Sequence, residues 1–391
     1  MSLLSDIKVL DVTQVLSGGF ASMMLADMGA EVVKIERPDT GEMGRANPPF
    51  VGDRSAYFMS LNRNKKSVTL DLGSAEGREA FLRLAETADV IVENLKPGTL
   101  TKFSLDYDSV RERNEGIIYC SISGFGQTGP YAALPALDVV IQAFSGSMSI
   151  TGPPGEQPYR AGIPIGDIAG SMYANQSILA ALHARDGTGK GQYIDVSMAE
   201  GLISWLTVRA GYTFATGNAY PRTGNQLDEI VPYGVYETAD AHIALAAVAD
   251  RHWDAFCELV DRQELAEDPR FHDMASRRKN REAVDELLSE VFAEGTTAEW
   301  FDRLAETVPV APVNDTKSVF EDEHVRERGL VEEREVDGHP HPFINLPVEF
   351  SAADTDIRRG PPTLGEDTRE ELRAVGYDEE TLDELDADGT I

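Results

Sequence analysis

The sequence predicts an α/β protein whose larger domain is built around a parallel, Rossmann-like sheet. Between residues 7 and 185, short β-rich runs alternate with segments of helical pattern, which is typical of a parallel sheet flanked by helices. After about residue 220 the pattern changes, and this indicates a second, smaller α+β domain. A chain of 391 residues also exceeds the usual size of a single core.

The individual elements follow from this alternation. In the first domain we expect strands at 7–12, 31–37, 67–72, 89–94 and 117–123, and helices at 19–28, 75–87 and 168–185. In the second we expect strands at 233–236 and 242–248 and helices at 251–259 and 298–306, the last behind a capping box from Thr296 to Glu299. A Pro-rich turn precedes a further helical stretch at 368–375. The predicted organisation is a large Rossmann-like domain at 1–200, a linker at 201–225, the small domain at 226–325, and a return linker with a C-terminal segment at 326–391 that packs on the large domain.

The composition describes a folded protein with a strongly acidic surface. The formal net charge is -32, from 67 acidic and 35 basic residues, and 42% hydrophobic residues are enough to form a core. Because the acidic residues are spread along the whole chain, we interpret the charge as adaptation to high salt in a halophile. The same charge argues against binding to nucleic acid or to an anionic membrane.

The cysteines and the N-terminal residues indicate a cytoplasmic protein. Cys120 and Cys257 lie in apolar surroundings and cannot form a disulfide framework. Residues 1–6 lack the basic region of a signal peptide, and no apolar run reaches the roughly 18 residues of a membrane span.

Three motifs that suggest nucleotide or metal binding are incomplete. Residues 124–129 match a dinucleotide fingerprint, but Pro130 follows where a phosphate-binding helix should begin, so we do not expect NAD. Residues 187–191 lack the Ser or Thr that binds magnesium in a P-loop. His339 and His341 have no partners at metal-ligand spacing, so we expect a loop there and no metal.

Asp167 is the strongest candidate for a reactive side chain. It follows an apolar run that ends in Gly166, at an expected turn from a strand to a helix, where the helix dipole favours an ionised carboxylate. Small neighbours, including Gly162 and Gly170, would let a bulky ligand approach the backbone. Aspartate is also a common N-cap, so the local sequence leaves both interpretations open.

Basic residues are relatively frequent in residues 1–105, which carry 12 basic and 14 acidic side chains. In so acidic a protein, this indicates a local site for an anionic ligand, with solvated surface charge as the alternative. The residues concerned are Arg37, Arg63, Lys65, Lys66, Lys96 and Lys102.

Motifs along the whole chain resemble those of the family III CoA-transferases, the CaiB/BaiF family, which also contains the 2-methylacyl-CoA racemases. The resemblance is specific for the superfamily, because the motifs are numerous and ordered, but it does not select one substrate. The matching stretches are Val9–Thr13, Leu25–Pro38, Leu61–Ser67, Glu93–Gly98, Gly124–Tyr131, Gly189–Ser197 and Leu364–Thr368.

The resemblance implies catalytic residues. Asp167 matches the family nucleophile, which forms an anhydride with the acyl group and then a thioester with CoA. Asp138 matches an acidic residue that can hydrogen-bond near it, and Gly224 and Asn225 match a mobile loop that shields the anhydride.

The resemblance also implies a CoA site in the large domain and no permanently bound cofactor, because CoA esters enter as substrates. Lys102 stands where the family has an arginine, and Ser123 stands where some relatives have a lysine, so both contacts depart from the pattern. The implied CoA-binding residues are Val15, Arg37, Leu70, Asn94, Leu95, Lys96, Lys102 and Ser123.

Two other functions remain as alternatives. The racemases use a histidine 30 residues before the aspartate, and Leu137 occupies that position here; leucine cannot act as a base. A protein that keeps only the fold would bind acyl-CoA without catalysis, although Asp167 is retained.

We expect acyl-CoA and a small carboxylic acid as the binding partners. The metabolism of a halophile suggests succinyl-CoA as the donor and a dicarboxylate such as mesaconate or citramalate as the acceptor. Arg45, Arg160 and Arg222 are candidates for binding a distal carboxylate through two hydrogen bonds.

Family resemblance further implies a homodimer of interlocked rings. Residues 210–225 would connect the two domains and residues 339–362 would return to the first. Their Gly and Pro content predicts extended crossings.

Overall fold

The computed structural model describes residues 2–391 and divides them into two compact units. Unit 1 contains residues 2–147, 160–208 and 324–391, and unit 2 contains residues 148–159 and 209–323. Unit 1 is therefore assembled from three separate stretches of chain, and most of unit 2 is inserted between two of them.

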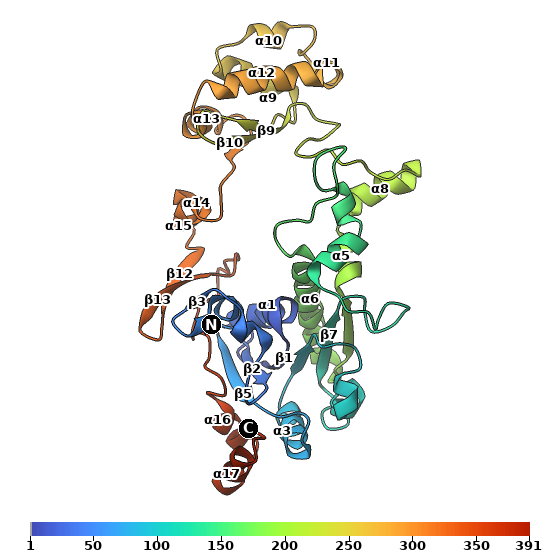
Figure 1. Cartoon of the computed structure of the whole chain (residues 1–391), viewed down its shortest axis with the longest axis vertical. Helices are drawn as coiled ribbons and strands as arrows, with labels where there is room; N and C mark the ends of the chain where they lie inside the picture. Colours follow the sequence, from blue (N-terminus) through green and yellow to red (C-terminus); the bar gives the residue numbers. More distant parts are fainter. Residues whose placement is uncertain (1) are drawn as a thin grey trace. The chain divides into compact units, whose positions relative to one another are not determined.

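A six-stranded parallel sheet forms the centre of unit 1 (Figure 1). The strand order is β5-β2-β1-β6-β7-β8, so strand addition reverses direction between β1 and β6. In doubly wound folds with this order, ligands bind at the carboxyl ends of the strands next to the reversal. The predicted parallel sheet is confirmed. Its strands are β1 (Lys8–Val12), β2 (Glu31–Glu36), β5 (Lys65–Thr69), β6 (Val90–Glu93), β7 (Ile118–Ser123) and β8 (Tyr193–Ser197).

Helices cover both faces of the sheet, because its central strands are apolar on both sides. Val9 and Val92 pack with α1, α6 and α7 on one face, whereas Leu10 and Ile91 pack with α3, α4, α16 and α17 on the other. These helices are α1 (Val15–Asp27), α3 (Ala75–Glu86), α4 (Tyr107–Arg111), α6 (Ile165–Thr188), α7 (Met198–Ser204), α16 (Thr368–Ala374) and α17 (Glu379–Ala387).

Shorter elements complete unit 1 around the sheet. They are η1 (Met43–Ala46), β3 (Phe50–Val51), β4 (Arg54–Ser55), α2 (Ala56–Leu61), η2 (Leu100–Phe103), α5 (Asp138–Phe144), β12 (Val331–Val336) and β13 (His339–Ile344), while η3 (Ser147–Ile150) and α15 (Glu323–Glu327) cross a unit boundary.

Several basic side chains of the first segment are buried in ion pairs. Lys65 places its Nζ 2.9 Å from a carboxylate oxygen of the fully buried Asp11. Burial alone would raise the pKa of Asp11, but Lys34 and Lys65 hold it well below its usual range. Arg63 pairs with buried Asp27 at 2.6 Å. The prediction that Arg63 and Lys65 bind an anionic ligand is therefore wrong, because both side chains form ion pairs inside the fold and are not available to a ligand.

Helix α16 docks on the edge of the sheet beside β5 (Figure 1). Glu371 accepts hydrogen bonds from Lys8 at 2.7 Å and from Lys66 at 2.5 Å, so Lys66 is also structural and the prediction that it binds an anionic ligand is wrong. Further along, the backbone N–H of Asp71 donates to the carbonyl of Thr390 at 2.8 Å. The C-terminal segment is thus an integral part of unit 1.

Unit 2 contains an antiparallel three-stranded sheet, ordered β11-β10-β9, covered by helices. The predicted capping box is confirmed, because Thr296 and Glu299 exchange both hydrogen bonds at the start of α13. Its strands are β9 (Tyr233–Glu237), β10 (His242–Ala246) and β11 (Val310–Pro312), and its helices are α9 (Asp250–Leu259), α10 (Glu264–Glu267), α11 (Met274–Lys279), α12 (Arg281–Ala293), α13 (Thr297–Leu304) and α14 (Ser318–Glu321).

Two segments predicted as extended or irregular are regular instead. Part of 210–225 lies in helix α8 (Thr207–Thr216), which has no buried residue. His339–Ile344 forms strand β13, which pairs in antiparallel register with β12. Local Gly and Pro content did not reveal either element. None of the helices in residues 2–391 combines the length and apolar character of a membrane span.

Candidate active site

Asp167 is the third residue of α6, inside its first turn. Pro164 occupies the N-cap, so the N-cap interpretation of Asp167 is wrong, and no strand precedes the helix at residues 159–164. The carboxylate of Asp167 accepts no hydrogen bond and forms no ion pair with residues 2–391, which leaves it available to a ligand.

Asp138 fixes the start of the helix that carries Asp167. Its Oδ1 accepts a hydrogen bond from the N–H of Gly166 at 2.8 Å, and its Oδ2 accepts one from Gln142 Nε2 at 2.7 Å. Gln142 in turn accepts from the N–H of Ala161 at 2.8 Å. One carboxylate and one amide therefore set both the helix and the loop that leads into it.

Within residues 2–391, no cation offsets the charge of Asp167. Burial, followed by the nearby charge of Asp138, raises the pKa of Asp167 to about 6. Burial, followed by the charges of Asp167 and Glu42, raises the pKa of Tyr57 to about 12. The Tyr57 hydroxyl therefore stays protonated at neutral pH and can donate a hydrogen bond near the carboxylate. Sequence reasoning missed Tyr57, because nothing in the sequence relates α2 to a residue 110 positions later.

Two of the small residues near Asp167 contact protein and not open space. A Cβ at Gly166 would lie 3.0 Å from Ile141, and one at Gly170 would lie 2.9 Å from Met198. Both glycines permit close packing, so the expectation that Gly170 accommodates a ligand is wrong. A Cβ at Gly162, in contrast, would meet no atom within 4 Å, so this glycine borders open space.

A cleft of about 480 Å³ opens at the carboxyl ends of β1, β2, β5 and β6, next to the reversal in strand order. Arg37, Leu70 and Leu95, all implied CoA-binding residues, line it together. Arg37 is exposed, and its side chain has no hydrogen bond or ion pair within residues 2–391. Glu42 lines the same cleft and acts electrostatically on Tyr57, which connects the cleft to the surroundings of Asp167.

Two further implied residues shape the cleft wall. Asn94 exchanges hydrogen bonds of 2.8 Å with both the N–H and the carbonyl of Gln14, a cleft residue. Val15 begins α1 with a φ of 53°, which is unusual for a β-branched residue, and its N–H donates to Glu42 at 2.8 Å. The side chains of Asn94 and Glu42 therefore hold this strained turn in place.

The remaining implied CoA residues lie outside this cleft. Lys96 lines a neighbouring cavity, and Lys102 is exposed on η2. Ser123 ends β7, and its buried Oγ has no hydrogen-bond partner in the described chain.

Gly224 and Asn225 belong to unit 2, where they line a cavity of about 690 Å³ with Tyr220 and Tyr233. Gly224 has a φ of 60°, a left-handed conformation that favours glycine, and its N–H donates to the carbonyl of Gly152 at 3.1 Å.

The three candidate arginines differ in availability. Arg45 forms two hydrogen bonds with Glu36, at 2.6 and 2.7 Å, and is engaged. Arg222 donates to backbone carbonyls of residues 149–156. Arg160 is exposed, and within residues 2–391 it donates only to the carbonyls of Ala161 and Gly162, in the loop before α6.

Comparison with known proteins gives consistent matches over the chain. The model of CoA-transferase family III matches residues 4–368. The chain is 40% identical to the succinyl-CoA:mesaconate CoA-transferase of Haloarcula marismortui, over 97% of this chain and 98% of the relative. It is 37% identical to the human succinyl-CoA:glutarate CoA-transferase, over 99% of this chain and 90% of the relative.

Solved structures agree. The CAIB/BAIF family protein from Brucella suis superposes with a TM-score of 0.88 at 34% identity, covering 96% of this chain and 99% of that protein. With the parallel sheet, the cleft at its switch point and the family match in place, the chain belongs to CoA-transferase family III and is an enzyme that transfers CoA.

Proposed function

We propose that this enzyme moves CoA from succinyl-CoA to a small dicarboxylate such as mesaconate or citramalate, with Asp167 as the nucleophile. The observation that carries the mechanism is an unpaired, half-buried carboxylate in the first turn of α6, close to Tyr57. The substrate assignment is supported by relatives named for mesaconate, glutarate and D-citramalate, the last 32% identical over 99% of this chain.

The proposed chemistry proceeds by acyl transfer alone. The Asp167 carboxylate attacks the thioester carbonyl, the C–S bond breaks, and a mixed anhydride forms with release of CoA thiolate. The thiolate attacks the aspartyl carbonyl, releasing the donor acid and leaving an aspartyl-CoA thioester. The acceptor carboxylate then attacks the carbonyl of this thioester, its C–S bond breaks, and a new anhydride forms with release of CoA thiolate. The thiolate attacks the acceptor carbonyl of this anhydride and breaks its bond to the Asp167 oxygen. The new acyl-CoA leaves, and the Asp167 carboxylate is restored.

Each attack creates an oxyanion that needs hydrogen-bond donors. The protonated Tyr57 hydroxyl is our candidate in unit 1. We assign the Gly224–Asn225 loop of unit 2 the role of shielding the anhydride from water. Asp138 acts as a positioning residue through Gly166. In the cleft, we assign the phosphates of CoA to Arg37 and its adenine to the apolar wall of Leu70 and Leu95.

Hydroxylamine trapping tests the nucleophile directly. The enzyme is incubated with succinyl-CoA and hydroxylamine, and the peptide that contains Asp167 is examined by mass spectrometry. We expect an aspartyl hydroxamate at Asp167, absent without succinyl-CoA. Exchange of an α-proton without trapping would indicate a racemase, and binding without either reaction would indicate a non-catalytic protein.

An acceptor series tests the substrates. Mesaconate, citramalate, glutarate, oxalate and monocarboxylates are compared with succinyl-CoA as the donor. Transfer to oxalate or monocarboxylates alone would contradict the dicarboxylate assignment. Arg160→Lys should weaken the binding of dicarboxylate acceptors more than that of monocarboxylates, because lysine cannot form the paired hydrogen bonds of a guanidinium.

We also propose a homodimer. Exposed apolar side chains support it: Leu137 is 74% exposed, Val208 is 73% exposed and Phe214 is 86% exposed, and α8 has no buried residue. Light scattering in molar salt should give about twice the 42.7 kDa of one chain. An active monomer would contradict the interlocked arrangement.

A further inference from the structure

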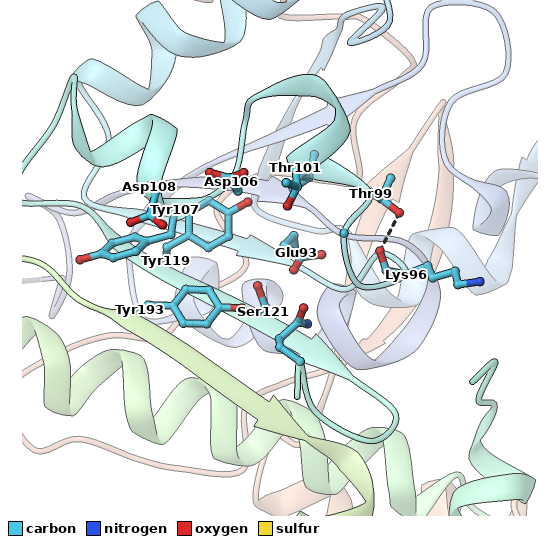
Figure 2. A pocket seen from close by; sticks show the side chains of 13 residues that line it. Glu93, Lys96, Thr99, Thr101, Asp106, Tyr107, Asp108, Tyr119, Ser121 and Tyr193 are labelled. Atoms are coloured by element: carbon cyan, nitrogen blue, oxygen red, sulfur yellow. Dashed lines mark hydrogen bonds between the residues drawn. The ribbon is translucent and has the colours of Figure 1, made fainter. Parts of the chain in front are cut away.

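A second cavity lies beside the proposed CoA cleft, at the carboxyl end of β6, along β7 and at the start of β8 (Figure 2). Its volume is about 350 Å³. Thr99 and Leu100 line both cavities, so the turn that follows β6 forms the wall between them.

Glu93, the last residue of β6, joins the two cavities. Its side chain lines the second cavity, although the residue is only 6% exposed. Its Oε2 accepts a hydrogen bond of 2.7 Å from the N–H of Leu95, and Leu95 lines the CoA cleft. One short contact therefore connects a buried carboxylate to the cleft wall.

The carboxylate of Glu93 has no cationic partner within residues 2–391. Burial raises its pKa to about 7, opposed by hydrogen bonds from Ser121 and from the Leu95 N–H, and the charge of Asp195 raises it further. The cavity gives protons access to the group. The titratable side chains around it are Lys96 on the turn, Asp106, Tyr107 and Asp108 at α4, Tyr119 and Cys120 on β7, and Tyr193 and Asp195 on β8.

We propose that Glu93 is a positioning residue for CoA binding: its ionised carboxylate fixes the Leu95 amide and with it the cleft wall, and proton uptake by Glu93 weakens CoA binding. A hydrogen bond to a charged acceptor is roughly twice as strong as one to a neutral acceptor, so protonation loosens the turn without removing the contact. This inference rests on the proposed assignment of the 480 Å³ cleft to CoA.

Calorimetric titration with CoA tests this linkage from pH 6 to pH 8. Glu93→Gln imitates the protonated group. Asp106→Asn is the matched control, because Asp106 lines the same cavity but its side chain caps α4, whereas that of Glu93 bonds to the turn after β6. We expect the variant E93Q to bind CoA about fivefold more weakly than the wild type at pH 8 and equally at pH 6. The titration of CoA itself cancels in this ratio, and D106N should follow the wild type throughout.

A ratio that does not change with pH, or an equal effect of D106N, would overturn the role of Glu93. If the wild type binds no CoA at any pH, the cleft assignment itself fails, which is a different result. Hydrogen exchange of the wild-type Leu95 amide gives a readout without substitution. Its protection, corrected for intrinsic exchange, should fall below pH 7, and constant protection would contradict the proposal.

Discussion

Asp167 illustrates how burial tunes a nucleophile. Because its pKa is raised to about 6, the ionised form is lost as the pH falls through that value. The transfer rate should therefore be about tenfold lower at pH 5 than at its plateau above pH 7. Asp138→Asn removes the negative charge that is the second cause of the raised pKa of Asp167. The fall in rate at acidic pH should therefore begin at a lower pH in this variant. The measurement is kcat as a function of pH for the wild type and the variant, in a buffer of constant ionic strength. If the two profiles coincide at acidic pH, Asp138 does not contribute to the raised pKa of Asp167.

The same burial makes Asp167 costly to the fold. A carboxylate with a raised pKa stabilises the folded state only when protonated, and this contribution is lost as the pH rises through about 6. Asp167→Asn should thus abolish transfer, yet raise the free energy of unfolding at pH 7 to 8 by up to about 3 kcal/mol, measured by urea unfolding. The gain should disappear near pH 4. A variant that is less stable than the wild type at every pH would contradict this account.

At this scale the sequence pointed to Asp167 and Asp138 but misjudged several basic residues. A single side chain in a sequence shows its charge but not its partner, so Lys65 resembled a ligand contact until Asp11 was seen beside it. Arg37 and Leu95 lie 58 positions apart, and it was the family resemblance, not spacing, that predicted their common cleft.

Among the elements, α16 offers the clearest test of packing. Glu371 is buried and accepts from Lys8 and Lys66, so Glu371→Ala should lower the unfolding free energy by about 2 kcal/mol. Its neighbour Glu370 is 74% exposed and lies 3.9 Å from Lys66, so Glu370→Ala should cost less than about 0.5 kcal/mol. Urea unfolding of both variants gives the comparison, and equal effects would show that the buried contact is unimportant.

The sheet was predictable because its strands are apolar on both faces and alternate with helices. The predicted strand at 89–94 and the observed β6 (Val90–Glu93) differ only at the ends. Helix α8 and strand β13 were not predictable in this way. The Gly and Pro content of these segments predicted extended crossings. Neither element packs a continuous apolar face into a core, because α8 buries no residue and β13 buries only Phe343.

For the whole molecule, the net charge of -32 sets the response to salt. The screening length falls from about 10 Å at 0.1 M to about 3 Å at 1 M, which weakens repulsion among surface carboxylates. We expect the thermal midpoint to rise by about 10 °C or more between these concentrations of KCl. Sucrose at equal osmolality is the control, and a midpoint independent of salt would contradict halophilic adaptation.

The assembly of unit 1 from three stretches of chain governs the order in which the protein can mature on the ribosome. Residues 324–391 are synthesised after all of unit 2, yet Leu372 and Leu382 fill the same core as Leu10 and Ile91. That face of the sheet is therefore covered only in part, by α3 and α4, while more than a hundred residues of unit 2 emerge. Unit 2 is fully synthesised before residues 324–391 emerge. It can therefore fold before unit 1 is complete, although its synthesis begins later.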